Sequence, residues 1–206
     1  MIFNLLIIAV LGYLLGSFPT AFLITKLLKK GNITELGTKN AGATNVAIIA
    51  GLKPSIITGA IDFSKGFFLI ILIKIIFSDW NLVYLIIGGS FAIVGHLYPL
   101  FTKFKGGKGH ATFAGVIMGI NYVIGIICAI IYLISIFITD QAGLGMTIIC
   151  ITFPIFLIVF GFSVGQSLTI VPAMLLMIWK NRFNIRRIRE RDELGWRSFF
   201  KNRKKN

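Results

Sequence analysis

Long apolar runs, separated by short polar segments, make up most of the chain. The runs cover residues 2–24, 51–77, 82–101, 111–139, 143–160 and 166–179. A helix needs about 20 mainly apolar residues to cross the hydrocarbon core of a bilayer, and most of these runs approach that length. The pattern predicts an all-α, polytopic integral membrane protein, a single domain over residues 1–206 whose basic tail is 181–206.

The first run contains an interruption, Gly16-Ser17-Phe18-Pro19-Thr20. Gly and Pro are tolerated inside membrane helices where neighbouring groups satisfy the freed backbone. The interruption therefore indicates either a functional kink or a packing notch. No Lys or Arg precedes this run and no small-residue cleavage site follows it, so we expect a retained helix rather than a signal peptide.

Residues 111–139 leave two topologies open. As one helix, these 29 residues would extend about 43 Å, which is long for a core of about 30 Å. A break at Asn121 would leave a first piece too short to cross unaided. One crossing here would put the C-terminal tail outside, whereas a half-helix followed by a full span gives seven transmembrane helices and a cytoplasmic tail. The positive-inside rule favours seven.

Charge placement underlies that choice. The net charge is +14, and 11 of the 21 Lys and Arg residues lie in 180–205, against three acidic residues there. In a soluble protein such a tail would suggest nucleic-acid binding. Directly after a membrane helix, the positive-inside rule and attraction to anionic lipid head groups explain it, and we expect no nucleic-acid partner.

The densest chemistry lies in residues 95–112. This segment holds both histidines of the chain and the stretch Lys105-Gly106-Gly107-Lys108-Gly109. A glycine-rich backbone can direct several N–H groups at one oxyanion, and Lys108 would add a point charge. The spacing is not that of a Walker A loop, since Gly109 rather than Ser or Thr follows the lysine. The segment is either a phosphate cradle or a basic loop beside a membrane helix.

The first polar loop of the chain, Gly37 to Val46, is rich in small residues, hydroxyls and side-chain amides. Such a segment can offer donors to an anion, although turns favour the same residues. With seven crossings, both loops and the basic tail share one face of the membrane. Three polar elements at one interface suit a ligand with a charged head and an apolar tail.

Asp62 is the one acidic residue inside an apolar run, and Lys65 follows it at a spacing of three. That spacing puts both on one helix face, close enough to pair. The pair is either part of a functional site or a buried contact that fixes helix packing. Cys128 and Cys150 lie in apolar runs and indicate small core residues, neither a disulfide framework nor a metal site.

Five blocks of the chain resemble bacterial membrane glycerol-3-phosphate acyltransferases that use acyl phosphate as donor, the PlsY family. The run from His96 to Thr112 is the most specific of them. The blocks, in order, are Gly16-Ser17-Phe18-Pro19, Gly37 to Asn45, Asp62-Phe63-Ser64-Lys65-Gly66, Gly95 to Thr112, and Arg182-x-Asn184-Ile185-x-Arg187.

The resemblance implies a seven-helix enzyme of the cell inner membrane with its site at the cytoplasmic interface. Such an enzyme moves a fatty acyl group from acyl phosphate to the 1-hydroxyl of glycerol 3-phosphate, giving lysophosphatidate and phosphate in phospholipid synthesis. Both substrates carry phosphate, which suits two anion-binding loops. The donor is a mixed anhydride with a good leaving group, so no cofactor and no strong protein nucleophile are expected; positioning and charge stabilisation suffice.

Residue roles follow from the same resemblance. Lys108 would bind phosphate in the catalytic step, Thr38 would act on the acyl-phosphate side, and Asn184 would stabilise the oxyanion. His96 would brace its loop, or be a satisfied interfacial histidine. The remaining substrate-binding residues would be Gly37, Asn40, Gly42, Asn45, Lys105, Gly106, Gly107, Gly109 and Arg182.

Three departures from the family pattern leave an alternative open. Thr38-Lys39 stands in the first loop where the family has Ser-Gly, Ile48 stands in place of an arginine, and Asn181 stands in place of a histidine. Lys39 or Arg182 could replace the missing cation. The alternative interpretation is a divergent, non-catalytic membrane paralogue or a transporter that keeps an anion- or lipid-binding pocket.

Overall fold

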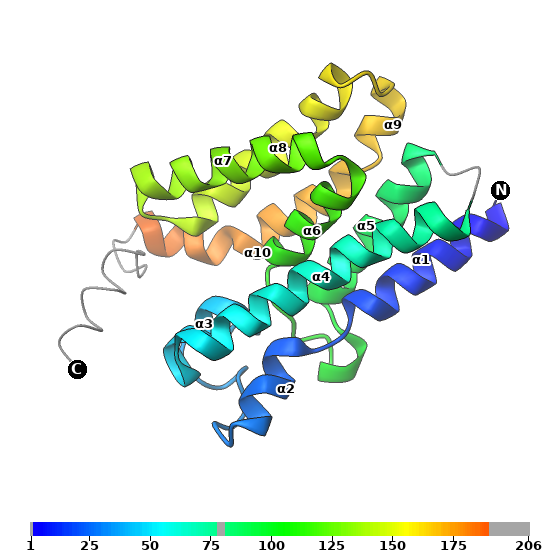
Figure 1. Ribbon diagram of the computed structural model, residues 1–206. Coiled ribbons are helices and arrows are strands. Elements are labelled where there is room, and N and C mark those ends of the chain that lie inside the picture. Colours follow the sequence, from blue (N-terminus) through cyan, green and yellow to red (C-terminus); the bar gives the residue numbers. More distant parts are fainter. Residues whose placement is uncertain (1, 78–80, 190–206) are drawn as a thin grey trace. The chain divides into compact units, whose positions relative to one another are not determined.

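The long apolar runs of the chain fold as helices. The computed structural model describes residues 2–77 and 81–189, with side chains described through residue 182 (Figure 1). Every regular element within those residues is helical, which confirms the all-α prediction. Two compact units are present, Met1–Tyr122 and Val123–Asn206. The expected outer turn at 78–81 and the end of the tail, 190–206, fall largely outside the described residues.

The first unit contains the helices that carry both polar loops. Its elements are α1 (Ile2–Gly16), α2 (Thr20–Leu27), α3 (Ala43–Ala50), α4 (Leu52–Ile76), α5 (Leu82–Leu97), the short 3-10 helix η1 (Leu100–Thr102) and α6 (His110–Ile120). The interruption predicted in the first run is confirmed, because α1 ends at Gly16 and α2 begins at Thr20.

Glycines let the helices of the first unit approach closely. A Cβ at Gly12 or Gly16 of α1 would overlap the backbone of Gly88 or Ala92 of α5, and a Cβ at Gly66 of α4 would overlap the backbone of α6. Small residues at such contacts are the usual means of close helix packing in membranes. Residue numbers rise together along α1 and α5, since Gly12 meets Gly88 and Gly16 meets Ala92, so these two helices are parallel. Residue numbers also rise together in the contacts of α4 with α6, which are therefore parallel too.

These directions place both polar loops at one end of the first unit. The chain leaves α2 at the same end as α5, and it enters α4 and α6 at that end too. Contacts between Asp62 and His96 at one level and between Ile73 and Gly88 at another show that α4 and α5 are antiparallel. The loop after α2 and the loop before α6 therefore lie beside each other.

The helix break at Asn121 is confirmed. α6 ends at Ile120 and α7 (Tyr122–Thr139) begins directly after Asn121. Lys74 of α4 donates hydrogen bonds from Nζ to the carbonyl oxygens of Gly119 and Ile120, at 2.8 and 3.1 Å. The last carbonyl groups of a helix have no partner within the helix, so this ammonium satisfies the end of α6.

The second unit holds α7, α8 (Ala142–Val159), α9 (Val164–Leu168) and α10 (Val171–Arg189). The run at 166–179, predicted as one crossing, is divided instead between α9 and α10. A capping box between Ser163 and Gln166 starts α9, and Pro172 stands in the first turn of α10, where its missing N–H costs nothing. Cys128 and Cys150 are buried free thiols, as expected.

Five segments of the described chain are long and apolar enough to cross a membrane. They are Ile2–Leu27, Leu52–Ile76, Leu82–Thr102, Tyr122–Thr139 and Ala142–Val159, and α6 is a shorter apolar helix. A polytopic membrane protein is thus supported, whereas seven crossings require α6 and α10 to cross as well.

The Asp62–Lys65 pair yields a first prediction. Its side chains are 4% and 7% exposed and meet at 2.9 Å, which confirms the expected ion pair. Replacing either residue alone with Ala leaves an uncompensated buried charge, which costs about 3–5 kcal/mol. We expect each single variant to lower the yield of folded protein by more than Asp62→Ala/Lys65→Ala does, measured by size exclusion in detergent. Equal and additive losses would contradict the pairing.

Candidate active site

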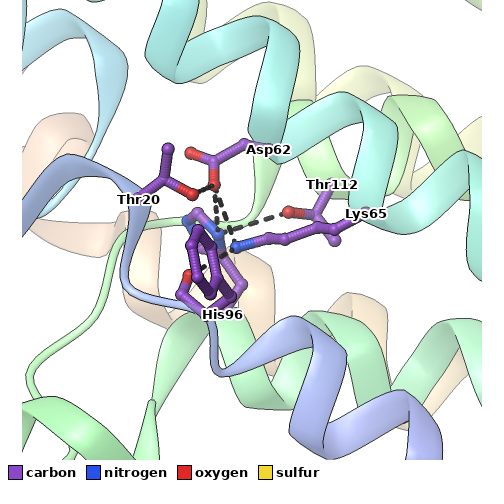
Figure 2. A network of polar contacts seen from close by, with 6 residues as sticks. Thr20, Asp62, Lys65, His96 and Thr112 are labelled. Carbon is purple, nitrogen blue, oxygen red and sulfur yellow. Dashed lines mark hydrogen bonds and ion pairs between the residues drawn. The ribbon is translucent and has the colours of Figure 1, made fainter. Parts of the chain in front are cut away.

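Asp62 is the centre of a buried polar cluster in the first unit (Figure 2). Its Oδ1 accepts a hydrogen bond from the hydroxyl of Thr20 at 2.9 Å and pairs with Nζ of Lys65 at 2.9 Å. Nδ1 of His96 lies 3.6 Å from the same oxygen. The carboxylate is thus met by side chains from α2, α4 and α5, which are separated by long stretches of sequence.

Two hydroxyl groups complete this cluster, and the sequence had not singled them out. Thr20 stands at the end of the interruption between α1 and α2, and Thr112 lies in the first turn of α6. The hydroxyl of Thr112 is 3.2 Å from Nδ1 of His96. The sequence showed only that one hydroxyl lies beside a helix break and the other beside a glycine-rich loop. It could not show which charged side chain each hydroxyl would contact, because that side chain is distant in sequence.

The glycine-rich loop before α6 is built directly on His96. The N–H of Gly107 donates to the carbonyl oxygen of His96 at 3.1 Å. A Cβ at Gly107 would overlap Nε2 of the His96 ring, and a Cβ at Gly106 would overlap the His96 carbonyl oxygen. Glycine is required at both positions because any side chain would separate the loop from the histidine. The prediction that His96 braces this loop is therefore supported by direct contact.

The first polar loop is organised by Asn45, which is fully buried at the start of α3. Its Oδ1 accepts the N–H of Thr38 at 2.8 Å, and its Nδ2 donates to the carbonyl oxygens of Ile33 and Leu36 at 3.1 and 3.0 Å. Gly37 has a φ of +55°, and a Cβ there would overlap Oδ1 of Asn45. The amide therefore determines the path of residues 33–38.

The two loops meet beside His96. The carbonyl oxygen of Ala41, in the first loop, lies 2.7 Å from the position that a Cβ of Gly107 would occupy. Next to this contact is a small cavity. Its walls come from both loops and the buried cluster: Phe18 to Phe22, Ala41, Asp62, His96, Pro99, Thr102, Lys105, Gly106 and Gly107.

The other predicted residues of the first unit surround this junction without all lining the cavity. Lys105 is exposed and lines it, Lys108 is half-buried, and Gly109 has a φ of +82° where α6 begins. Asn40 and Gly42 lie in the turn before α3, where the N–H of Gly42 donates to the Asn40 carbonyl oxygen at 3.0 Å. Ile48, the position without the family's arginine, is 39% exposed on α3.

The predicted residues of the second unit lie on α10. Arg182 stacks its guanidinium on the ring of Trp179, 3.6 Å from the ring centroid, and donates to the carbonyl oxygen of that residue at 2.8 Å. Asn181 is buried and donates from Nδ2 to the Gly143 carbonyl oxygen at 2.8 Å. Asn184 belongs to the same helix, but its side chain is outside the described part of the structure.

The chemistry available at the junction is anion binding and charge stabilisation. Backbone N–H groups of glycine-rich loops and nearby lysines suit phosphate. No group of three His, Cys, Asp or Glu side chains that could hold a metal ion is present among the described residues. His96 is already in contact with Asp62, Thr112 and the loop backbone, which is the environment of a supporting residue.

Comparison with known proteins identifies the family. The family model described as Glycerol-3-phosphate acyltransferase matches residues 6–191. A protein named Glycerol-3-phosphate acyltransferase 2 from Lactobacillus acidophilus is 38% identical over 186 residues, covering 89% of this chain and 86% of that protein.

Two crystal structures of PlsY (YgiH), an integral membrane glycerol 3-phosphate acyltransferase, show the same architecture. The glycerol 3-phosphate form has a TM-score of 0.84 at 30% identity, covering 93% of this chain and 95% of that chain. The lysophosphatidic acid form has a TM-score of 0.83 at 30% identity, covering 94% of this chain and 96% of the other. The chain with its two glycine-rich loops joined at His96 therefore belongs to the glycerol-3-phosphate acyltransferase family of integral membrane proteins.

Proposed function

We propose that this protein transfers a fatty acyl group from acyl phosphate to the 1-hydroxyl of glycerol 3-phosphate, forming lysophosphatidate and phosphate. The observation that carries the proposal is the junction of two glycine-rich loops at His96, since both substrates present phosphate. Related crystal structures described as glycerol 3-phosphate and lysophosphatidic acid forms support the acceptor and the product.

The reaction needs little covalent chemistry from the protein. The 1-hydroxyl oxygen attacks the acyl carbon, an ester bond forms, and the bond between that carbon and the phosphate oxygen breaks. The hydroxyl proton leaves with the phosphate, which can itself serve as the base. The contribution of the protein is to align the two substrates and to stabilise the negative charge that develops.

The loops supply these two contributions. Lys108 and the N–H groups of Gly106, Lys108 and Gly109 bind phosphate, while Gly107 holds the loop against His96 and Lys105 lines the cavity. Thr38, Asn40 and Gly42 form the acyl-phosphate side, while Gly37 and Asn45 give that loop its path. For two residues of α10, only the family resemblance implies a role: oxyanion stabilisation for Asn184 and positive charge for Arg182.

We further propose seven membrane crossings with both loops and the basic tail on the cytoplasmic side of the inner membrane. The parallel course of α4 and α6 supports this topology, because α6, like α4, begins at the end that carries the two loops and runs toward the other end of the first unit. With α6 and α10 as crossings, the tail returns to the side of the two loops, as the positive-inside rule requires.

A second candidate function is binding without catalysis. It is favoured by Ile48 and Asn181, which replace an arginine and a histidine of the family pattern. The amide of Asn181 is engaged by the Gly143 carbonyl oxygen, and Arg182 is stacked on Trp179. A protein of this kind would bind glycerol 3-phosphate or a lysolipid but would not release phosphate.

Activity can be measured with palmitoyl phosphate and glycerol 3-phosphate. We expect release of inorganic phosphate and formation of lysophosphatidate, with acyl-coenzyme A a poor donor. Lys108→Met should lower the rate by at least about a hundredfold, the usual loss when a preorganised charge at a reacting centre is removed. Thr38→Ala should be milder, and Ile48→Arg should leave or raise activity if acceptor binding is limited by the missing arginine.

The same assay separates the two candidate functions. Folded wild-type protein that releases no phosphate contradicts the enzyme. If that protein still binds glycerol 3-phosphate, and Lys108→Met abolishes the binding, the binding protein takes its place.

The location of the tail tests the topology. Residues 180–206 carry a net charge of +8, from 11 basic and three acidic residues, so we expect the C-terminus in the cytoplasm. A pair of C-terminal reporters, one active only in the cytoplasm and one only outside, should report the cytoplasmic side. Activity of the outside reporter alone would separate the tail from the two loops and exclude the shared face.

A further inference from the structure

Asp62 lies beneath both glycine-rich loops and belongs to neither. Its contacts with Thr20, Lys65 and His96 all fall on one oxygen, Oδ1. Lys65 in turn donates from Nζ to the carbonyl oxygen of Phe18 at 3.2 Å, inside the interruption between α1 and α2. One carboxylate thus connects the start of α2 and the exposed backbone of the interruption to the end of α5.

His96 carries this connection to the loops. Its ring faces Asp62 and Thr112 with Nδ1, and it faces Gly107 with Nε2. Asp62 lies 3.6 Å from Nδ1, an electrostatic contact rather than a hydrogen bond, and the Thr112 hydroxyl lies 3.2 Å from the same nitrogen. A carboxylate that faces one ring nitrogen favours one orientation of the ring, as in carboxylate–histidine pairs elsewhere. The position of Gly107 therefore depends on a ring that Asp62 orients.

The contact at Gly107 transmits the position to both loops. Nε2 of the His96 ring and the carbonyl oxygen of Ala41 both lie where a Cβ of Gly107 would stand, so there is no room for a Cβ. If the ring turned, the glycine-rich loop would lose the group that holds Gly107 beside the Ala41 carbonyl oxygen. The hydrogen bond and ion pairs of Asp62 go to Thr20, Lys65 and His96 rather than to the loops, so its effect on the loops passes through His96.

We propose that Asp62 is a positioning residue that, through His96, sets the affinity of the glycine-rich loop at 106–109 for a phosphate monoester, glycerol 3-phosphate in the proposed function. The inference rests on that function. The loop N–H groups bind the acceptor phosphate in the bound substrate and in the transition state alike, so their displacement weakens both equally. Loss of such uniform binding raises KM and leaves kcat nearly unchanged.

The test uses full-length protein and steady-state kinetics in glycerol 3-phosphate. Asp62→Asn is combined with Lys65→Met, so that no unpaired charge remains. We expect KM for glycerol 3-phosphate to rise by about tenfold and kcat to change by less than about threefold. His96→Ala should have the same effect. Adding His96→Ala to the double variant should raise KM little further, because residues on one path are not additive.

Lys74→Met is the matched control. It removes another lysine of α4, which satisfies carbonyl groups at the far end of α6 rather than the cluster beneath the loops. We expect a lower yield of folded protein with KM unchanged. If the role of Asp62 were purely structural, its variants would likewise lower the yield of folded protein and leave KM unchanged.

Thr20→Val tests the inference if the Asp62 variants do not fold. It removes one hydrogen bond to Oδ1 at nearly constant shape, and should raise KM by about threefold. An unchanged KM in folded Thr20→Val protein, or effects of Asp62 and His96 that multiply fully, would overturn the inference while leaving the enzyme intact. If wild-type protein is inactive, the dissociation constant for glycerol 3-phosphate replaces KM, and absence of both binding and turnover refutes the proposed function together with this inference.

Discussion

The structure of the site depends on satisfying one buried carboxylate. A charge placed among apolar helices is costly unless donors meet it. Asp62 is met by the ammonium of Lys65 on its own helix and by two groups from elements that are distant in sequence, the hydroxyl of Thr20 and the ring of His96. The requirement fixes where α2, α4 and α5 come together. Because the backbone of His96 also supports Gly107, the same requirement extends to the loop that would bind phosphate.

Close helix packing decides at which end this chemistry collects. Glycines at positions 12 and 16 bring α1 against α5, and Gly66 brings α4 against α6, each pair running in parallel. Because α4 and α5 are antiparallel while α1 is parallel to α5 and α4 to α6, both polar loops lie at one end of the first unit. Glycine at 106 and 107 then lets the second loop lie directly on the histidine. The small residues thus allow close helix packing in the membrane and close contact between the loop and His96.

Asn181 and Ile48, which differ from the family pattern, lie in different surroundings in this chain. Asn181 donates to the Gly143 carbonyl oxygen, and so ties α10 to the start of α8. Arg182 is stacked on Trp179, and Ile48 is partly exposed on α3. These contacts tie α10 to α8 and occupy Arg182 without supplying an ionisable side chain at 181 or a cation at 48.

The sequence alone determined the membrane class, the interruption at 16–20, the break at Asn121, the Asp62–Lys65 pair and the family, because each follows from periodicity, local spacing or a contiguous motif. It did not reveal that Thr20 and Thr112 complete the cluster, that Asn45 organises the first loop from within, or that 166–179 divides into two helices. The cluster depends on which distant groups face a buried charge, and only the packing of helices that lie far apart in the chain decides that. The contacts of Asn45 and the capping box of α9 span few residues, but the path of the loop and the division of the helix appear only in the folded chain.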